Sequence, residues 1–68
     1  MNPYQLTFVL RDGRQHSTKH FADTRWDALT FGLMRWQDKS MFVKLTNPGT
    51  DTAFLCSDIA EIVVEDWE

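Results

Sequence analysis

Cysteine is almost absent from this chain, because Cys56 is the only one among 68 residues. An intramolecular disulfide needs two thiols, so the usual covalent staple of a small domain is excluded. Without a staple, a single core of this size supplies only about 3 to 5 kcal/mol of net stability. We therefore expect a reduced, cytoplasmic protein in which Cys56 is a small buried hydrophobe and a second copy is a candidate stabiliser.

Long apolar runs are also missing. No stretch approaches the roughly 18 apolar residues of a membrane-spanning helix, and residues 1–8 lack the basic and apolar regions of an export signal. Hydrophobic content of 43% with 25% charged residues is typical of a globular domain. We expect residues 1–68 to form one small domain that is neither exported nor embedded in a membrane.

Motifs that announce catalysis are absent as well. The three glycines and one cysteine form no phosphate-binding loop and no paired-cysteine site. His16 and His20 have the spacing of a zinc-binding helix, but in an extended segment they stand about 13 Å apart, whereas a zinc–imidazole bond measures about 2 Å. One helix over a thin sheet also leaves little volume for a pocket of the usual few hundred Å³. These features predict a non-enzymatic protein without metal or cofactor.

Basic residues are missing from the last third of the chain. Residues 1–44 carry all seven Lys and Arg with four acids, a net charge of +3, whereas residues 45–68 carry six acids and no base, a net charge of −6. Such segregation can steer a charged partner. The alternative is a solvated acidic tail that only keeps the protein soluble. We expect a protein partner with a basic surface.

A basic cluster on the first hairpin favours a different function. Arg11, Arg14 and Lys19 are interleaved with histidines and are candidates for contacts to nucleic acid. Three cations release only about three counterions, against the six to ten phosphate contacts of a typical specific binder. Nucleic-acid binding by these residues is therefore the second hypothesis, behind protein binding.

The amino-terminal half begins with a predicted hairpin. Residues 4–10 alternate between apolar and polar side chains, the period of two expected of a half-buried strand. The pair Asp12-Gly13 favours a tight turn. The return strand, residues 14–22, is mostly polar, so we place it at a sheet edge.

The register of this hairpin depends on the length of its loop, and two pairings are open. A two-residue loop at Asp12-Gly13 puts Ser17 and Lys19 on the apolar face of the first strand. A loop one residue longer puts His16 and Thr18 there instead.

A helix is predicted from about residue 25 to residue 38 or 39. Asp23 or Thr24 can cap it, and Asp27 suits its first turn. On a helical wheel one arc of about 80° gathers four large apolar residues, which we expect to be the buried face, with Ala28 and Gly32 on its flank. These four residues are Trp26, Leu29, Leu33 and Trp36.

Three further strands are predicted after the helix. Residues 41–46 and 51–56 form a second hairpin around the turn 47–50, in which Gly49 takes the positive φ of a type II turn. Residues 57–61 form a tight turn before a last strand, residues 62–65. The expected fold is α+β, an antiparallel sheet of four to five strands with one helix packed on one face, in the order ββαβββ. The expected sheet contribution to the core is Leu6, Phe8, Leu10, Val43 and Leu45.

Two features of this pattern suggest contacts with other molecules. Val63 points opposite to Ile62 and Val64, so the last strand is either central in the sheet or paired with a second copy in a homodimer. Phe31 and Met34 lie on the helix face predicted to point away from the sheet. An aromatic and a thioether rimmed by charge are typical of a partner-binding spot, unless Trp67 folds back and covers them.

Residues 21–29, FADTRWDAL, followed by WQ at 36 and 37, resemble the helix entry of small phage proteins of strand–strand–helix–strand order, such as the host RNA polymerase inhibitor of podophages. The short chain, the polar second strand and the segregated charge also resemble many anti-CRISPR proteins. The resemblance implies a small acidic phage or mobile-element protein that occupies a surface of its host. It assigns no binding residue.

Together these observations predict a non-enzymatic protein-interaction module that inhibits a bacterial protein or protein–nucleic-acid machine. A structural homo-oligomer is a further alternative. The expected partner-binding residues are Asp27, Phe31, Met34 and Asp38 on the helix, with Asp58, Glu61, Glu65, Asp66 and Trp67 in the acidic third.

Overall fold

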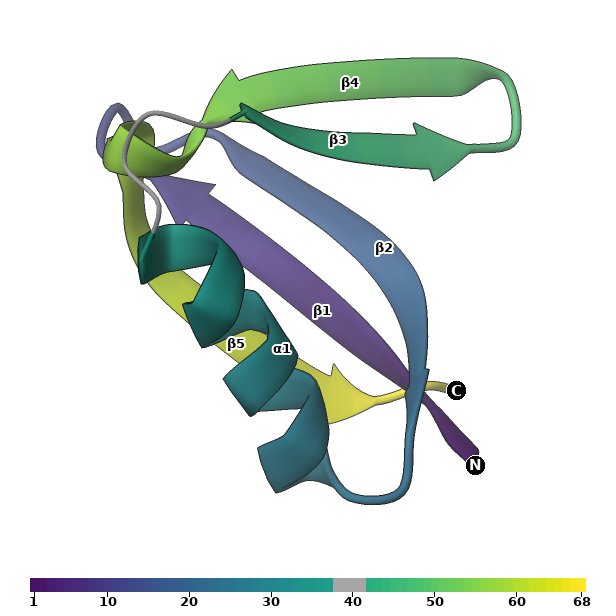
Figure 1. The fold of residues 1–68 in the computed structure, drawn as a ribbon. Helices are drawn as coiled ribbons and strands as arrows, with labels where there is room; N and C mark the ends of the chain where they lie inside the picture. Colours follow the sequence, from purple (N-terminus) through teal and green to yellow (C-terminus); the bar gives the residue numbers. More distant parts are fainter. Residues whose placement is uncertain (38–41) are drawn as a thin grey trace.

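The computed structural model describes residues 1–37 and 42–68, without the side chains of Arg35 and Trp36. Within these ranges the chain is α+β, with one helix and five strands in the expected order ββαβββ (Figure 1). Asp38 lies outside the described residues. The elements are β1 (Asn2–Leu10), β2 (Gln15–Ala22), α1 (Arg25–Gln37), β3 (Phe42–Asn47), β4 (Thr50–Leu55), the short 3-10 turn η1 (Cys56–Asp58) and β5 (Ile59–Asp66).

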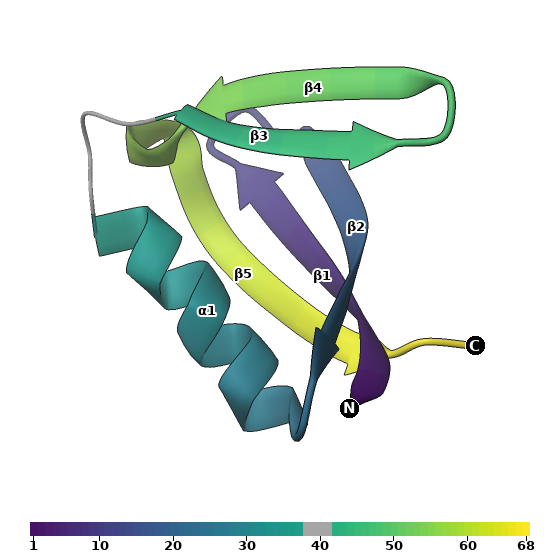
Figure 2. The ribbon, with the colours of Figure 1, turned by 45° about the vertical axis from the view of Figure 1, so that its right-hand side comes forward.

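The strands form two antiparallel sheets, so the expectation of one sheet of four to five strands is wrong in this detail. One sheet has the order β2-β1-β5 and the other is the β3–β4 hairpin. The hairpin crosses one end of the larger sheet instead of extending it (Figure 2). It meets the β2 edge through a side chain, because the Asn47 amide donates a hydrogen bond to the Ser17 carbonyl at 3.1 Å. Strand β2 is an edge strand, as its polar sequence predicted.

The loop between β1 and β2 decides the register of the first hairpin. The Gly13 N–H donates to the Leu10 carbonyl at 2.9 Å, and the Leu10 N–H donates to the Arg14 carbonyl at 2.8 Å. Gly13 has a φ of +92°, which a side chain rarely adopts. This is a three-residue loop, the longer of the two alternatives. The inner face of β2 therefore carries His16 opposite Phe8.

One face of the three-stranded sheet, here called the inner face, holds the core. The expected apolar residues of β1 and β3 are all buried there, together with Phe54 and Ile59. Cys56 is buried among them, as expected. Helix α1 covers the β5 side of this face, and the β3–β4 hairpin covers its other end (Figures 1 and 2). No helix in the described ranges is long and apolar enough to cross a membrane.

Helix α1 begins after Thr24, whose hydroxyl accepts a hydrogen bond from the Asp27 N–H at 3.1 Å, so the predicted cap is confirmed. The predicted buried face is wrong. Trp26 is 71% exposed and Leu33 is 41% exposed, whereas Ala28 is fully buried. The side chain of Trp36 lies outside the description.

The reason is the close approach of the helix to the sheet. A Cβ atom on Gly32 would lie 2.9 Å from Cγ2 of Ile62, so no larger residue fits there without movement. Ala28 and Gly32 are one turn apart and form the contact line with the sheet. The large apolar residues consequently straddle this line, Phe31 on one flank and Leu29 with Leu33 on the other.

Candidate partner-binding surface

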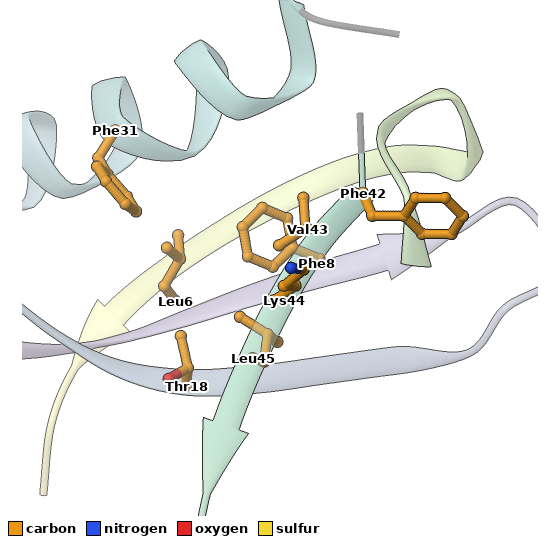
Figure 3. Close-up of a pocket in the computed structure, with 8 residues that line it drawn as sticks. All are labelled: Leu6, Phe8, Thr18, Phe31, Phe42, Val43, Lys44 and Leu45. Atoms are coloured by element: carbon orange, nitrogen blue, oxygen red, sulfur yellow. The ribbon is translucent and has the colours of Figure 1, made fainter. Parts of the chain in front are cut away.

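A groove on the inner face, here called the central groove, lies between α1 and β3 (Figure 3). Its volume is about 370 Å³. The expectation that the fold leaves too little volume for a pocket of a few hundred Å³ is therefore wrong. Among the described residues of its lining, Lys44 is the only titratable side chain, and the others are apolar apart from Thr18. General acid–base chemistry needs two such groups in reach of one substrate. The lining residues are Leu6, Phe8, Thr18, Phe31, Phe42, Val43, Lys44 and Leu45.

Phe31 does not lie on the far side of the helix, as its predicted position required. Its ring points toward Leu6 on the sheet (Figure 3) and is 36% exposed. It stacks on His20, with ring centroids 4.3 Å apart and planes 18° from parallel. The correction follows from the contact line at Ala28 and Gly32, which turns Phe31 inward. Met34 is 65% exposed, as predicted, and Asp27 is exposed in the first turn.

The histidines of β2 each join the sheet to one of its covering elements. His20 stacks on Phe31 of α1, and His16 stacks on Phe54 of β4, with centroids 5.0 Å apart and planes 12° from parallel. Both rings are half-buried. This packing gives both histidines a structural role at the boundary of the core.

The predicted acidic residues lie along β5 and next to it, and they do not converge on Phe31. Glu61 and Glu65 pair with Val9 and Gln5, so their side chains share the outer face of the sheet. Asp66 lies 3.5 Å from Arg25 in an exposed ion pair. Asp58 belongs to η1, and its carbonyl oxygen accepts a hydrogen bond from the Arg11 N–H at 2.9 Å.

Trp67 is on the opposite side of the sheet from Phe31. The Lys19 ammonium lies 5.1 Å from the Trp67 ring centroid and 5.3 Å from that of Phe21, on the outer face. The suggestion that Trp67 folds over Phe31 and Met34 is therefore wrong, because the odd-numbered residues of β2 point outward in the observed register.

The three predicted nucleic-acid contacts are dispersed. Arg14 pairs with Asp12 at 2.7 Å, and a hydrogen bond from the Arg14 backbone N–H holds the pKa of the Asp12 carboxyl below its usual value. Nε of Arg11 donates to the Ser57 carbonyl at 3.1 Å. Lys19 is five residues along β2 from Arg14, about 16 Å in extended chain. Arg11 and Arg14 line one pocket beside the β1–β2 loop, and Lys19 lies apart from them, so the three do not form one cluster.

A second groove, missed by the sequence reasoning, runs between α1 and β5. Its volume is about 210 Å³, and its lining is apolar except for Glu61. Leu33 lines it and Trp26 stands exposed one helical turn before Leu29. We call this surface the edge groove, defined by Leu29, Leu33, Ile59, Ala60, Glu61 and Ile62. The sequence signal for it is the spacing of Ala28 and Gly32, which moves the large residues to the flanks.

Comparison with protein-family models, curated proteins and solved structures finds no match to this chain.

Proposed function

We propose that this chain is a non-enzymatic protein-interaction module that binds a partner protein through the edge groove and the exposed side of α1 beside it. The observation that carries the proposal is the pair Trp26 and Leu33. Both side chains are large, apolar and exposed to solvent. Leu33 lines the edge groove, whose lining is otherwise largely apolar. Aromatic and aliphatic anchors beside a pocket are typical of binding hot spots.

The chemistry of the grooves supports binding over catalysis. Among the described residues, the one titratable side chain in the central groove is Lys44, and the one titratable residue along the edge groove is Glu61, whose carboxylate points to the outer face of the sheet. Within the described residues, neither lining has the paired acid and base of a typical active site. Apolar surface with a single charge at the rim instead suits a protein partner.

The biological role that we propose is inhibition of a bacterial protein or protein–nucleic-acid machine by a phage or mobile-element protein. It rests on the likeness of residues 21–29 to phage inhibitors and on the acidic charge of residues 45–68. Five of those six acids lie on η1, on β5 or just after it. Because β5 also borders the edge groove, a basic partner surface would approach the groove under favourable electrostatics.

The test is capture of partners from bacterial lysate by immobilised protein and by matched variants. Trp26→Ser with Leu33→Ser should abolish capture of the specific partner, because both anchors of the groove are lost. Phe42→Ser is the control, since Phe42 is also exposed but lies on the hairpin. Met34→Ser tests the other flank of α1. Capture that survives the double variant and fails with Met34→Ser would contradict the assignment to the edge groove.

A further inference from the structure

Strand β5 forms an open edge of the three-stranded sheet. It pairs with β1 on one side, and within the described residues no strand pairs with the other. The Trp67 N–H donates a hydrogen bond to the carbonyl of Pro3, its cross-strand partner on β1, at 3.4 Å. Hydrogen-bonded pairs alternate along an antiparallel ladder. Val63 and Glu65 therefore direct their backbone groups at β1, whereas Ile62 and Val64 direct theirs at the open edge.

The two faces of this edge differ in chemistry. Ile62 and Val64 are half-buried on the inner face under α1, where Ile62 lines the edge groove with Leu29 and Leu33 and Val64 packs against Ala28 and its neighbours. On the outer face Val63 lies between two exposed carboxylates, Glu61 and Glu65. A strand added at this edge would meet apolar side chains on the inner face and two carboxylates on the outer face.

We propose that this edge receives an extended segment of a basic partner protein, added to β5 as an antiparallel strand. The segment has the pattern Lys/Arg–apolar–any–apolar–Lys/Arg. Its two apolar side chains lie opposite Ile62 and Val64, under the α1 overhang, and its two basic side chains lie opposite Glu61 and Glu65. Main-chain hydrogen bonds from the edge supply affinity, and the alternating side chains supply specificity.

Charge favours such a partner over a second copy of this chain. Two copies of β5 paired about a two-fold axis at Val63 set Glu61 of one copy opposite Glu65 of the other. A two-fold axis at Ile62 leaves the same carboxylates as diagonal neighbours. Like charges directly opposite each other on adjacent strands are destabilising, whereas opposite charges there stabilise the pair. A basic strand would instead place opposite charges next to Glu61 and Glu65, so the same two side chains would stabilise the pairing.

This inference rests on the proposed function, since it names the partner chemistry of the same surface. Its probe is the blocked peptide Thr-Lys-Val-Thr-Val-Lys-Thr, titrated into the full chain and followed by nuclear magnetic resonance. The amide signals of Ile62 and Val64 should shift and gain protection from hydrogen exchange. Those of Ser17 and Lys19 at the β2 edge should not.

Two peptide controls separate strand addition from attraction of charge. Methylating the amide nitrogens of both peptide valines removes the donors that face β5 and should abolish binding. Methylating two amides that face away should leave most of it. A peptide with Glu in place of both Lys should not bind. Equal binding by the two methylated peptides would overturn the inference.

Two protein variants carry the same charge change. Glu61→Gln with Glu65→Gln should weaken peptide binding about fivefold, as two cross-strand pairs predict. Asp23→Asn with Asp51→Asn, neither of which lies on β5, should change it less than twofold. Equal losses in the two variants would mean that the peptide senses only net charge, which contradicts the pairing.

Three other outcomes are decisive. Absence of binding at millimolar peptide overturns strand addition, while dependence of lysate capture on Trp26 and Leu33 would still support the proposed function. If the peptide binds but the Trp26→Ser, Leu33→Ser variant still captures its partner from lysate, the proposed function is wrong and strand addition stands. A dimer in sedimentation, with Ile62 and Val64 amides protected in the free protein, would show that a second copy occupies the edge.

Discussion

Both flanks of α1 carry large apolar side chains, but the two flanks meet different surroundings. On one flank Phe31 turns down into the central groove and stacks on His20. On the other, Leu33 lines the edge groove beside β5, and both Leu33 and Trp26 are exposed. The two flanks differ in burial because the sheet extends beneath only one of them. The sheet continues under Phe31 as β1 and β2, whereas it ends at β5 under Leu33.

The comparison teaches that helix hydrophobicity alone does not identify the buried face. Burial depends on the width of the sheet beneath the helix as much as on the helix itself. A helix that contacts the sheet through Ala28 and Gly32 near a sheet edge buries one flank and leaves the other exposed to solvent. Three substitutions can break or sharpen this contrast.

The largest effect is expected from Gly32→Val, which attacks the line between the two flanks. A Cβ atom there lies 2.9 Å from Cγ2 of Ile62, and valine adds two further methyl groups. Overpacking of this kind costs about 1 to 3 kcal/mol, and we expect the upper end because the clash is close to the Ile62 backbone. Urea denaturation measures it. Thr30→Val, on the exposed side of α1, is the control and should stay within about 0.5 kcal/mol of wild type.

An intermediate effect is expected from Phe31→Ala. A fully buried phenylalanine costs about 3 to 5 kcal/mol on truncation. Because a third of this ring is exposed, we expect about 2 kcal/mol. Met34→Ala, also on this flank but exposed, should cost less than about 0.5 kcal/mol. A double-mutant cycle with His20→Ala should show a coupling of about 0.5 to 1.5 kcal/mol from the stacked rings. Equal stability of Phe31→Ala and Met34→Ala would remove the distinction between their positions.

The smallest effect on stability is expected from Trp26→Ala, despite the size of the side chain. With 71% of its surface exposed, the indole contributes little to the core, and we expect a loss below about 1 kcal/mol. The same variant should lose about 2 kcal/mol or more of partner affinity if the indole is an anchor. Melting temperature and partner affinity, measured side by side, test whether this flank is kept for binding. A large melting shift would assign Trp26 to the core.

Local patterns predicted the elements well. Alternation identified β1, the Thr24 cap began α1, and Gly49 has the φ of +80° that a type II turn requires. The polar composition of β2 correctly placed it at an edge. Each of these features depends on residues close together in the sequence, so the sequence contains the necessary information.

The misses are all non-local. A helical wheel weighted the large residues and did not show that Gly32 would meet Ile62, thirty positions away. The division into two sheets places the β3–β4 hairpin across the larger sheet, where Asn47 bonds to Ser17 thirty positions away, and no pattern within β3 specifies this contact. The edge groove was missed for the same reason, since Leu29 and Ile62 are 33 positions apart in the sequence.

The loop Arg11–Gly13 makes the first hairpin sensitive to the parity of its own length. Deleting one residue would exchange the inner and outer faces of β2, bringing the Lys19 ammonium under the helix and removing both histidine stacks at once. Inserting two residues would preserve every one of those contacts, at a loop-closure cost of less than about 0.6 kcal/mol. Length variation in descendants of this chain should therefore accumulate at this loop in steps of two residues.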